Sequence, residues 1–179
     1  MNRRHFVRAS GTAALAAMPA ALVNAGERSS RADKRLIDAV TALISDWRRK
    51  DINAVLARVT HDIVWYSHVG SPPLHGKTEM RGVLEPMAAG ITDIRWRIFN
   101  YGVNGNRIFL EGADDFVMIK EQRQVAIPYM GTMTFRGPLI SEWRDYFDRG
   151  LFNRLKAGEP VPAEIATLLA RPAITSFAR

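Results

Sequence analysis

The sequence of 179 residues contains no cysteine, and this absence excludes several kinds of site at once. Disulfide bonds, iron–sulfur clusters, thiolate zinc sites and a cysteine nucleophile all require a thiol. The sequence also lacks the glycine-rich signatures of nucleotide binding and the G-x-S-x-G turn of serine hydrolases. Any catalysis is therefore left to carboxylates, histidine and tyrosine, and no cofactor is expected.

Acidic residues are scarce relative to basic ones, 18 against 25, so the formal net charge is +7. Such an excess is typical of proteins that bind nucleic acid. Here, however, Arg3, Arg4 and Arg8 precede the first acidic residue, Glu27, and supply three of the excess charges. The other basic residues are interspersed with acidic and apolar ones and form no basic tract. Nucleic acid is therefore not an expected partner.

The N-terminus is organised like an export signal. An arginine-rich start is followed by an apolar run, residues 13–23, which is shorter than the ~20 residues needed to span a bilayer. The order Arg3-Arg4-x-Phe6 resembles the twin-arginine export signal. We expect residues 1–25 to be a cleaved signal peptide and the mature protein to be periplasmic or secreted, without stable membrane insertion. An ordinary secretory signal and an uncleaved anchor are the alternatives.

The hydrophobic pattern after a predicted linker, residues 26–34, changes from a helical to an alternating period. The predicted helices comprise residues 35–49, 54–59, 79–89 and a final helical turn, 147–155. The predicted strands comprise residues 61–69, 91–103, 106–120, 125–135 and 139–148. This order predicts an α+β fold in which one curved, mostly antiparallel sheet packs on N-terminal helices as a cone around an apolar cavity. The domain should span residues 35–155, and residues 156–179 should form a C-terminal tail.

Two aspartates lie inside predicted strands, where aspartate is uncommon. Asp114 shares a face with Phe116, and Asp145 shares a face with Trp143 and Phe147. Two carboxyls buried near each other resist joint ionisation, which leaves one neutral acid and one ionised base. Such a pair suits water addition or proton transfer on an apolar substrate. Alternatively, both aspartates point to solvent and pair with arginines.

The predicted strand 61–69 offers two further polar side chains. Tyr66 and His68 share one of its faces, and Trp65 and Ser67 share the other. His68 is either part of the site or a structural histidine. The histidines of this region are too widely spaced for a compact metal site, and no metal is expected.

The segment WRDYFD, residues 143–148, together with Tyr66 and the following PPLHG, resembles the limonene epoxide hydrolase family. That family belongs to the nuclear transport factor 2-like cone folds, as do polyketide-cyclase-like and ketosteroid-isomerase-like enzymes. The resemblance implies that Asp145 activates a water and that Asp114 protonates the epoxide oxygen. It implies that Tyr66 holds the water together with His68, which stands where the family has asparagine.

One position departs from this family, since Gly112 stands where an arginine bridges the two carboxyls. His68 could supply the missing positive charge, position the water or act as the base, and Gly112 could widen the cavity. The resulting expectation is a cofactor-free, epoxide hydrolase-like enzyme for a small apolar substrate. An isomerase or cyclase, or a non-catalytic ligand-binding or dimerisation module, are the alternatives, and a homodimer is possible. The expected substrate contacts are Phe116, Trp143, Phe147, Met87 and Tyr129.

Overall fold

The N-terminal part of the protein forms three helices in the computed structural model, which describes residues 20–175. These are α1 (Ala20–Arg48), α2 (Ile52–Ala57) and α3 (Gly76–Gly90). The predicted linker, residues 26–34, was wrong, because these residues continue α1. Five of these nine residues are good helix formers, and none is proline. The predicted export signal lies mostly outside the described residues, with its last part in the first turns of α1.

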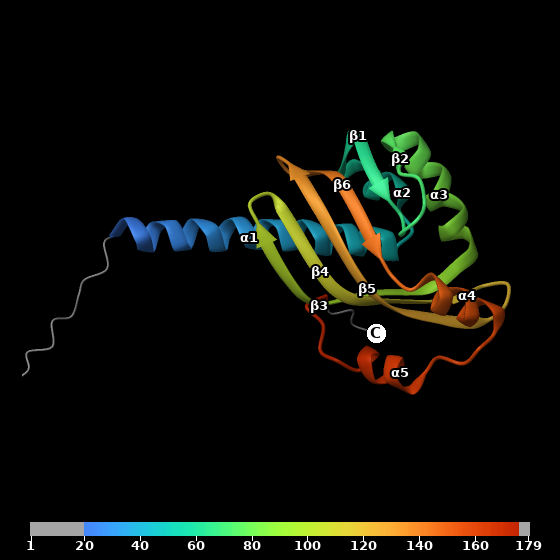
Figure 1. Ribbon diagram of the computed structural model, residues 1–179. Helices are drawn as coiled ribbons and strands as arrows, with labels where there is room; N and C mark the ends of the chain where they lie inside the picture. The colour runs from blue at the N-terminus through green and yellow to red at the C-terminus, as the bar shows by residue number, and fades with distance from the viewer. Residues whose placement is uncertain (1–19, 176–179) are drawn as a thin grey trace, which may run out of the picture.

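The strands that follow form a single six-stranded sheet in the order β2-β1-β6-β5-β4-β3 (Figure 1). Their bounds are β1 (Val59–Tyr66), β2 (Leu74–His75), β3 (Ile91–Asn104), β4 (Arg107–Met118), β5 (Arg123–Arg136) and β6 (Leu139–Tyr146). Every neighbouring pair is antiparallel except β1 and β6, which are parallel. The α+β prediction and the mostly antiparallel sheet are confirmed.

A close approach between β3 and β4 accompanies an irregularity in the sheet. The register shifts between Ile98 and Asn100, so that Phe99 is an extra residue opposite Gly112 and Glu111. A β-carbon on Gly112 would lie 1.9 Å from the carbonyl oxygen of Arg97. Glycine is therefore required where the bulged strand approaches its neighbour, and bulges of this kind bend a strand and increase its twist.

The segment predicted as a C-terminal tail is folded onto the sheet. It contains the end of α4 (Arg149–Ala157) and all of α5 (Ala163–Leu169). Beyond α5, the Ile174 N–H donates to the Ile98 carbonyl at 2.7 Å, and the Ile98 N–H donates to Thr175 Oγ1 at 3.0 Å. β3 is an edge strand, and its backbone groups at the bulge need partners that β4 does not provide. The C-terminal segment satisfies them.

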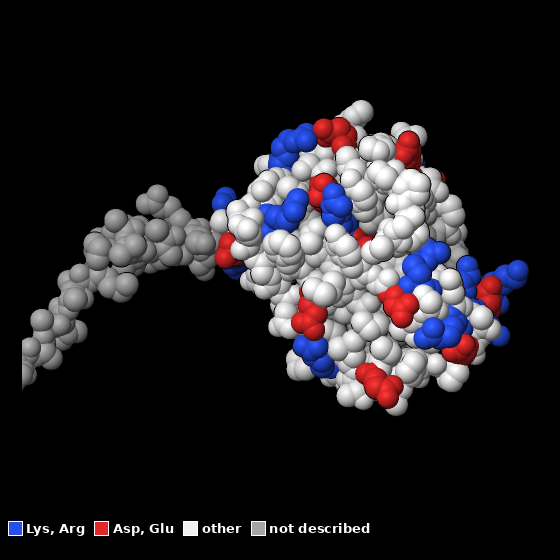
Figure 2. Space-filling model, in the orientation of Figure 1, with Lys and Arg blue, Asp and Glu red and all other residues white. Residues whose placement is uncertain are grey.

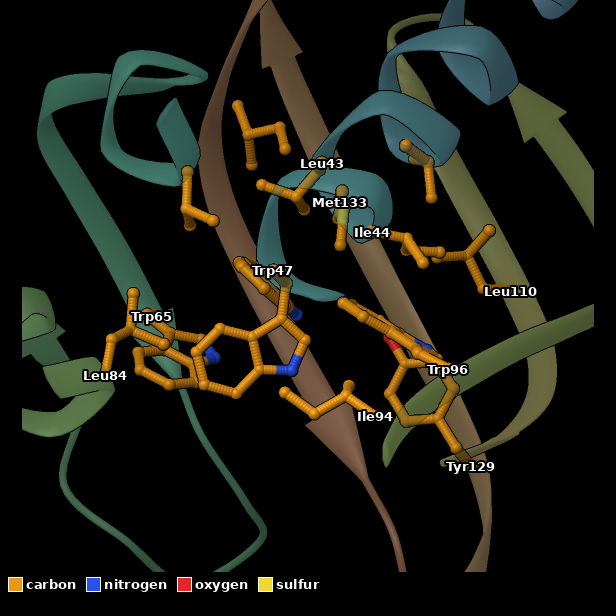
Figure 3. Close-up of a cluster of buried hydrophobic side chains, with 14 of the residues drawn as sticks. Leu43, Ile44, Trp47, Trp65, Leu84, Ile94, Trp96, Leu110, Tyr129 and Met133 are labelled. Atoms are coloured by element: carbon orange, nitrogen blue, oxygen red, sulfur yellow. The ribbon is translucent and has the colours of Figure 1, made fainter. Parts of the chain in front are cut away.

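The concave side of the sheet packs against α1 and α3 through a core of buried apolar side chains (Figure 3). Leu43 and Ile44 of α1 and Met133 of β5 are fully buried within it. Within residues 20–175, no helix is both long and apolar enough to span a membrane. On the surface shown in Figure 2, basic and acidic side chains are intermixed.

Candidate active site

The sheet and the helices surround a cavity of about 290 Å³ with a largely apolar wall. All four tryptophans of the chain line it: Trp47, Trp65, Trp96 and Trp143. Its polar side chains are Ser67, His68, Asp114, Tyr129, Asp145 and Arg149. The five residues expected to contact substrate, Phe116, Trp143, Phe147, Met87 and Tyr129, also lie in the lining. The cavity thus combines a large apolar surface with few polar groups, as small-molecule sites do.

Asp145 is held by two indole groups. Trp143 Nε1 donates to Asp145 Oδ1 at 2.6 Å, and Trp65 Nε1 donates to Asp145 Oδ2 at 2.9 Å. Burial raises the pKa of Asp145 to about 7, while these two hydrogen bonds and the nearby Tyr129 hydroxyl oppose the rise by stabilising the anion. Because an indole can only donate, both carboxylate oxygens keep a lone pair directed elsewhere. Asp145 can therefore accept a proton near neutral pH.

The carboxyl group of Asp114 has no comparable pair of hydrogen-bond donors within the described residues. Its Oδ1 atom is buried and makes no hydrogen bond with the described residues. Part of the side chain remains accessible because it lines the cavity, yet burial raises its pKa to about 8. The negative charges of Asp115 and Asp145 add to this rise, and Arg97 opposes it. Asp114 is therefore the carboxyl of the pair that retains its proton to higher pH.

The two aspartates thus have unequal affinities for a proton because they have unequal hydrogen-bond partners. Asp145 receives two N–H donors, whereas Asp114 Oδ1 receives none. The charge of Asp145 also disfavours ionisation of Asp114, so the titration of Asp114 depends on that of Asp145. Near neutral pH, the arrangement provides Asp145 as a base and Asp114 as a neutral acid.

Two further buried polar atoms without a hydrogen bond belong to the cavity lining, Trp96 Nε1 and the Tyr129 hydroxyl. Trp96 and Tyr129 lie side by side, with ring centroids 5.3 Å apart in an edge-to-face arrangement (Figure 3). Burial and the nearby charge of Asp145 hold the pKa of Tyr129 well above its usual range, so its hydroxyl keeps its proton. Unpartnered buried polar atoms are uncommon in folded proteins. Three such atoms, Asp114 Oδ1 included, therefore belong to residues that line this one cavity.

A second glycine makes room for the Tyr129 hydroxyl. A β-carbon on Gly131 would lie 1.9 Å from that oxygen. Gly131 is also the residue directly opposite Asp145 in the β5–β6 pairing. The absence of a side chain at Gly131 therefore lets the phenol reach the vicinity of the carboxylate, although no hydrogen bond of good geometry joins them.

The structure places Tyr66 outside the site. Its ring lies under the guanidinium of Arg144, with the Cζ atom 3.8 Å from the ring centroid, and it does not line the cavity. Trp65 faces the cavity instead, since it is directly opposite Trp143 in the β1–β6 pairing. The water-holding role expected of Tyr66 therefore has no geometric basis. The sequence analysis chose the wrong face of β1 as the one that faces the cavity, and it therefore did not predict Trp65 as a site residue.

His68 lines the cavity, but its contacts differ from those expected. β1 ends at Tyr66, so the two-residue alternation no longer applies at Ser67 and His68, and both reach the lining. Arg149 Nη1 lies 2.8 Å from His68 Nε2. Since arginine only donates, Nε2 is the acceptor and the imidazole is neutral. Burial and the charge of Arg149 also hold the pKa of His68 below its usual range. His68 therefore supplies neither the missing cation nor a free base.

Gly112 does not widen the cavity. It is absent from the lining, and the carbonyl of Arg97 fills the space that a side chain would enter. This close approach explains why an arginine is not accommodated there. In the described part of the chain, no cluster of histidine and carboxylate side chains is arranged to hold a metal ion.

Comparison with known proteins gives a family match and several structural neighbours. The model of the SnoaL-like domain family matches residues 40–143. An LEH-like epoxide hydrolase from Mycobacterium tuberculosis is 25% identical, with a TM-score of 0.60 over 70% of this chain and 92% of that one. An NTF2-like protein of unknown function from Burkholderia pseudomallei is 20% identical, with a TM-score of 0.61 over 68% of this chain and 96% of that one.

A candidate polyketide cyclase from Xanthomonas campestris is 17% identical, with a TM-score of 0.62 over 68% of this chain and 97% of that one. No curated protein matches the chain. These structural neighbours share the NTF2-like fold with this chain, which confirms the predicted cone architecture.

Proposed function

We propose that this chain, which belongs to the SnoaL-like domain family, is a cofactor-free acid–base enzyme that adds water to a small, largely apolar epoxide. The observation that carries the proposal is the buried pair of Asp145 and Asp114, whose unequal hydrogen bonding separates a base from an acid. The WRDYFD segment and the likeness to the LEH-like epoxide hydrolase from Mycobacterium tuberculosis support this reaction class.

In the proposed reaction, Asp145 removes a proton from a water molecule as the water oxygen bonds to an epoxide carbon. The bond from that carbon to the epoxide oxygen breaks, and Asp114 transfers its proton to the leaving oxygen. The product is a diol. The proton gained by Asp145 then replaces the one lost by Asp114, either through solvent or within the pair.

The absence of a bridging arginine is compatible with this assignment. In this chain, Trp65 and Trp143 supply the N–H donors that favour the ionised form of Asp145. The neutral form of Asp114 needs no cation, because burial and neighbouring negative charges already favour it. The two indoles thus perform the electrostatic role without a positive charge between the carboxyls.

A second reaction class, isomerisation or cyclisation by proton transfer, is favoured by Trp96 Nε1 and the Tyr129 hydroxyl. Both are buried donor atoms of lining residues and have no hydrogen-bond partner within residues 20–175. Buried donors of this kind stabilise negative charge that develops on a carbonyl oxygen. Asp145 would then remove a proton from carbon, and no water would enter the product. The candidate polyketide cyclase among the structural neighbours shares the fold in which such a site would operate.

Isotope labelling tests the proposal and separates its alternatives. Small apolar epoxides such as styrene oxide and cyclohexene oxide are incubated with the protein in ¹⁸O-labelled water, and the products are examined by mass spectrometry. A labelled diol is expected. Asp145→Asn and Asp114→Asn should each lower turnover by at least about 10²-fold. Glu111→Gln is the matched control, because Glu111 lies on the same strand as Asp114, is half-buried, is paired with Arg171 and does not line the cavity.

Unchanged turnover in folded Asp145→Asn would contradict the proposal. Unlabelled, rearranged product from a carbonyl substrate would favour isomerisation or cyclisation. Binding without turnover, tolerant of both asparagine variants, would indicate a ligand-binding module.

Export to the periplasm or the outside is also proposed, and it rests on the sequence of residues 1–25. Fractionation of cells expressing the chain, with N-terminal sequencing of the mature protein, tests it. Replacement of Arg3 and Arg4 by lysine should retain the protein inside the cell if the twin-arginine route is used. Homodimerisation remains a proposal that the sedimentation of the purified protein tests.

A further inference from the structure

The entrance of the cavity carries a cation whose charge is not neutralised within the described structure. Arg149, the first residue of α4, both lines the cavity and is exposed, which places it at the opening. Of the lysines and arginines within residues 20–175, it alone lines the cavity. Among residues 20–175 no carboxylate forms an ion pair with it. The adjacent Asp148 uses its Oδ1 to cap α4 through Gly150 and Leu151.

The contacts of Arg149 hold the guanidinium in place without neutralising it. Nη1 donates to the neutral imidazole of His68 at 2.8 Å, and Cζ lies 6.0 Å from the ring centroid of Phe152. The other ring nitrogen of His68, Nδ1, is 3.2 Å from Ser67 Oγ, so His68 is itself fixed. The guanidinium has five N–H donors, and only one is used by His68. The remaining donors are available to an acceptor at the opening.

The two ends of the cavity therefore differ in charge. The wall that carries Asp114 and Asp145 is unfavourable to an anionic group, because a further negative charge there would be repelled by the ionised carboxylate. Most of the other lining side chains are apolar, including Phe116 and Phe147, and Arg149 is exposed whereas Asp145 is buried. An anionic group on a ligand has a favourable position only beside Arg149.

We propose that Arg149, positioned by His68, binds a carboxylate at one end of the substrate, so that the substrate is an apolar carboxylic acid whose reacting oxygen lies at the other end. The position of the reacting oxygen rests on the proposed function, whereas the binding of the carboxylate does not. A carboxylate fits because it accepts two parallel N–H bonds from one guanidinium. Arg149 and His68 are specificity-determining residues in this assignment and take no part in the bond-breaking step.

Binding of a matched pair of ligands tests this inference without requiring turnover. Octanoate and octanamide have the same apolar chain and differ in the charge of the head group. Binding is followed by intrinsic tryptophan fluorescence, since all four tryptophans line the cavity, and by calorimetry. In the unmodified protein, octanoate should bind about tenfold more tightly than octanamide. This preference should shrink as salt concentration rises, because the contact is at an exposed opening.

Arg149→Gln should remove the preference and leave octanamide binding unchanged, and Arg149→Glu should make octanoate the weaker ligand. Arg154→Gln is the matched control, since Arg154 lies on the same helix, is outside the lining and should leave the preference intact. His68→Gln should reduce the preference only in part.

Equal binding of octanoate and octanamide by the unmodified protein, or a preference that persists in Arg149→Gln, would overturn the inference while leaving the proposed function in place. This outcome would be recognised if the protein forms labelled diols from uncharged epoxides but binds octanoate and octanamide equally well. Failure of both ligands to alter tryptophan fluorescence or release heat would instead argue against a small-molecule cavity, and so against the proposed function itself.

Discussion

Trp65 and Trp143 lie directly opposite each other on the parallel strands β1 and β6, and both indole N–H groups donate to the carboxylate of Asp145. Their ring centroids are 5.3 Å apart, and Trp143 also stacks on Trp96 at 5.6 Å. The base is therefore supported by aromatic side chains that form the wall of the cavity. The same residues that line the cavity beside Asp145 also stabilise its charge.

Replacing Trp65 by phenylalanine should raise the pKa of Asp145. Phenylalanine preserves most of the packing but removes the N–H that donates to Oδ2, so the anion loses one of its two indole partners. The acid limb of the pH profile of kcat/KM should move to higher pH. Trp47→Phe is the control, because Trp47 lines the same cavity but donates to neither carboxyl. An acid limb that stays in place in Trp65→Phe would contradict the role assigned to this indole.

The proposed activity of the unmodified protein should be confined to a narrow pH range. Asp145 must be ionised to act as a base, so the rate should fall as the pH decreases below about 7. Asp114 must be protonated to act as an acid, so the rate should also fall as the pH increases above about 8. Measurement of kcat/KM against pH should give a bell-shaped curve that reports the coupled pair. A rate that remains constant above pH 9 would exclude Asp114 as the proton donor.

The free energy of unfolding should decrease as the pH rises from about 4 to about 8. Asp114 has a pKa of about 8 in the folded protein against 3.8 for the unperturbed group, so the folded state binds the extra proton in this range. Its contribution to stability is fully present below the unfolded pKa and is lost as the pH rises through the folded pKa. Asp114→Asn should flatten this decrease by an amount on the order of a few kcal/mol.

Urea unfolding at a series of pH values measures this effect. Asp62→Asn is the control, since the nearby Thr60 hydroxyl and the hydrogen bonds from Arg136 lower the pKa of Asp62 and place its titration below this range. An identical pH dependence in Asp114→Asn and the unmodified protein would show that Asp114 is not buried in an unfavourable environment.

Substitution of Gly112 by alanine should destabilise the protein by about 1–3 kcal/mol. The new β-carbon would lie 1.9 Å from the carbonyl oxygen of Arg97, which belongs to the backbone and moves only if β3 shifts. Gly112→Arg should be at least as harmful and should not create a bridge between the carboxyls. Gly102→Ala is a matched control on the neighbouring strand, because a β-carbon there meets no atom within 4 Å. Thermal unfolding of these variants provides the measurement, and equal stability of the alanine variants would contradict the explanation.

The hydrophobic pattern predicts the main elements and puts each aspartate on the face of its aromatic neighbours, but it leaves open whether that face points inward or to solvent. Alternation along β4 and β6 puts Asp114 with Phe116, and Asp145 with Trp143, on the face that lines the cavity. The pattern failed at β1, where apolar and aromatic side chains occupy both faces and period two alone does not identify the inner one. Tyr66 was assigned to the cavity, whereas pairing with β6 turns Trp65 inward.

The hydrophobic pattern also did not predict the structure of two segments that flank the domain, residues 26–34 and the segment around Thr175. Residues 26–34 are polar but compatible with a helix, and they extend α1. Thr175 carries no distinctive motif, yet it is buried because the bulge in β3 leaves backbone groups that it can bond. The conformation of residues 26–34 follows from the helix that they continue. The position of Thr175 follows from contacts with β3, which is far away in sequence.

The sequence by itself determined the chemical inventory of this protein: no thiol, two aspartates inside strands and aromatic side chains spaced to share their faces. Only the tertiary structure decided how these groups act on one another. Strand register brings two indoles to Asp145 and leaves Asp114 without a comparable donor. Backbone contact at Gly112 excludes an arginine, and the start of α4 sets Arg149 beside His68. Proton affinity depends on burial and on distance to donors and charges, and these are properties of the fold.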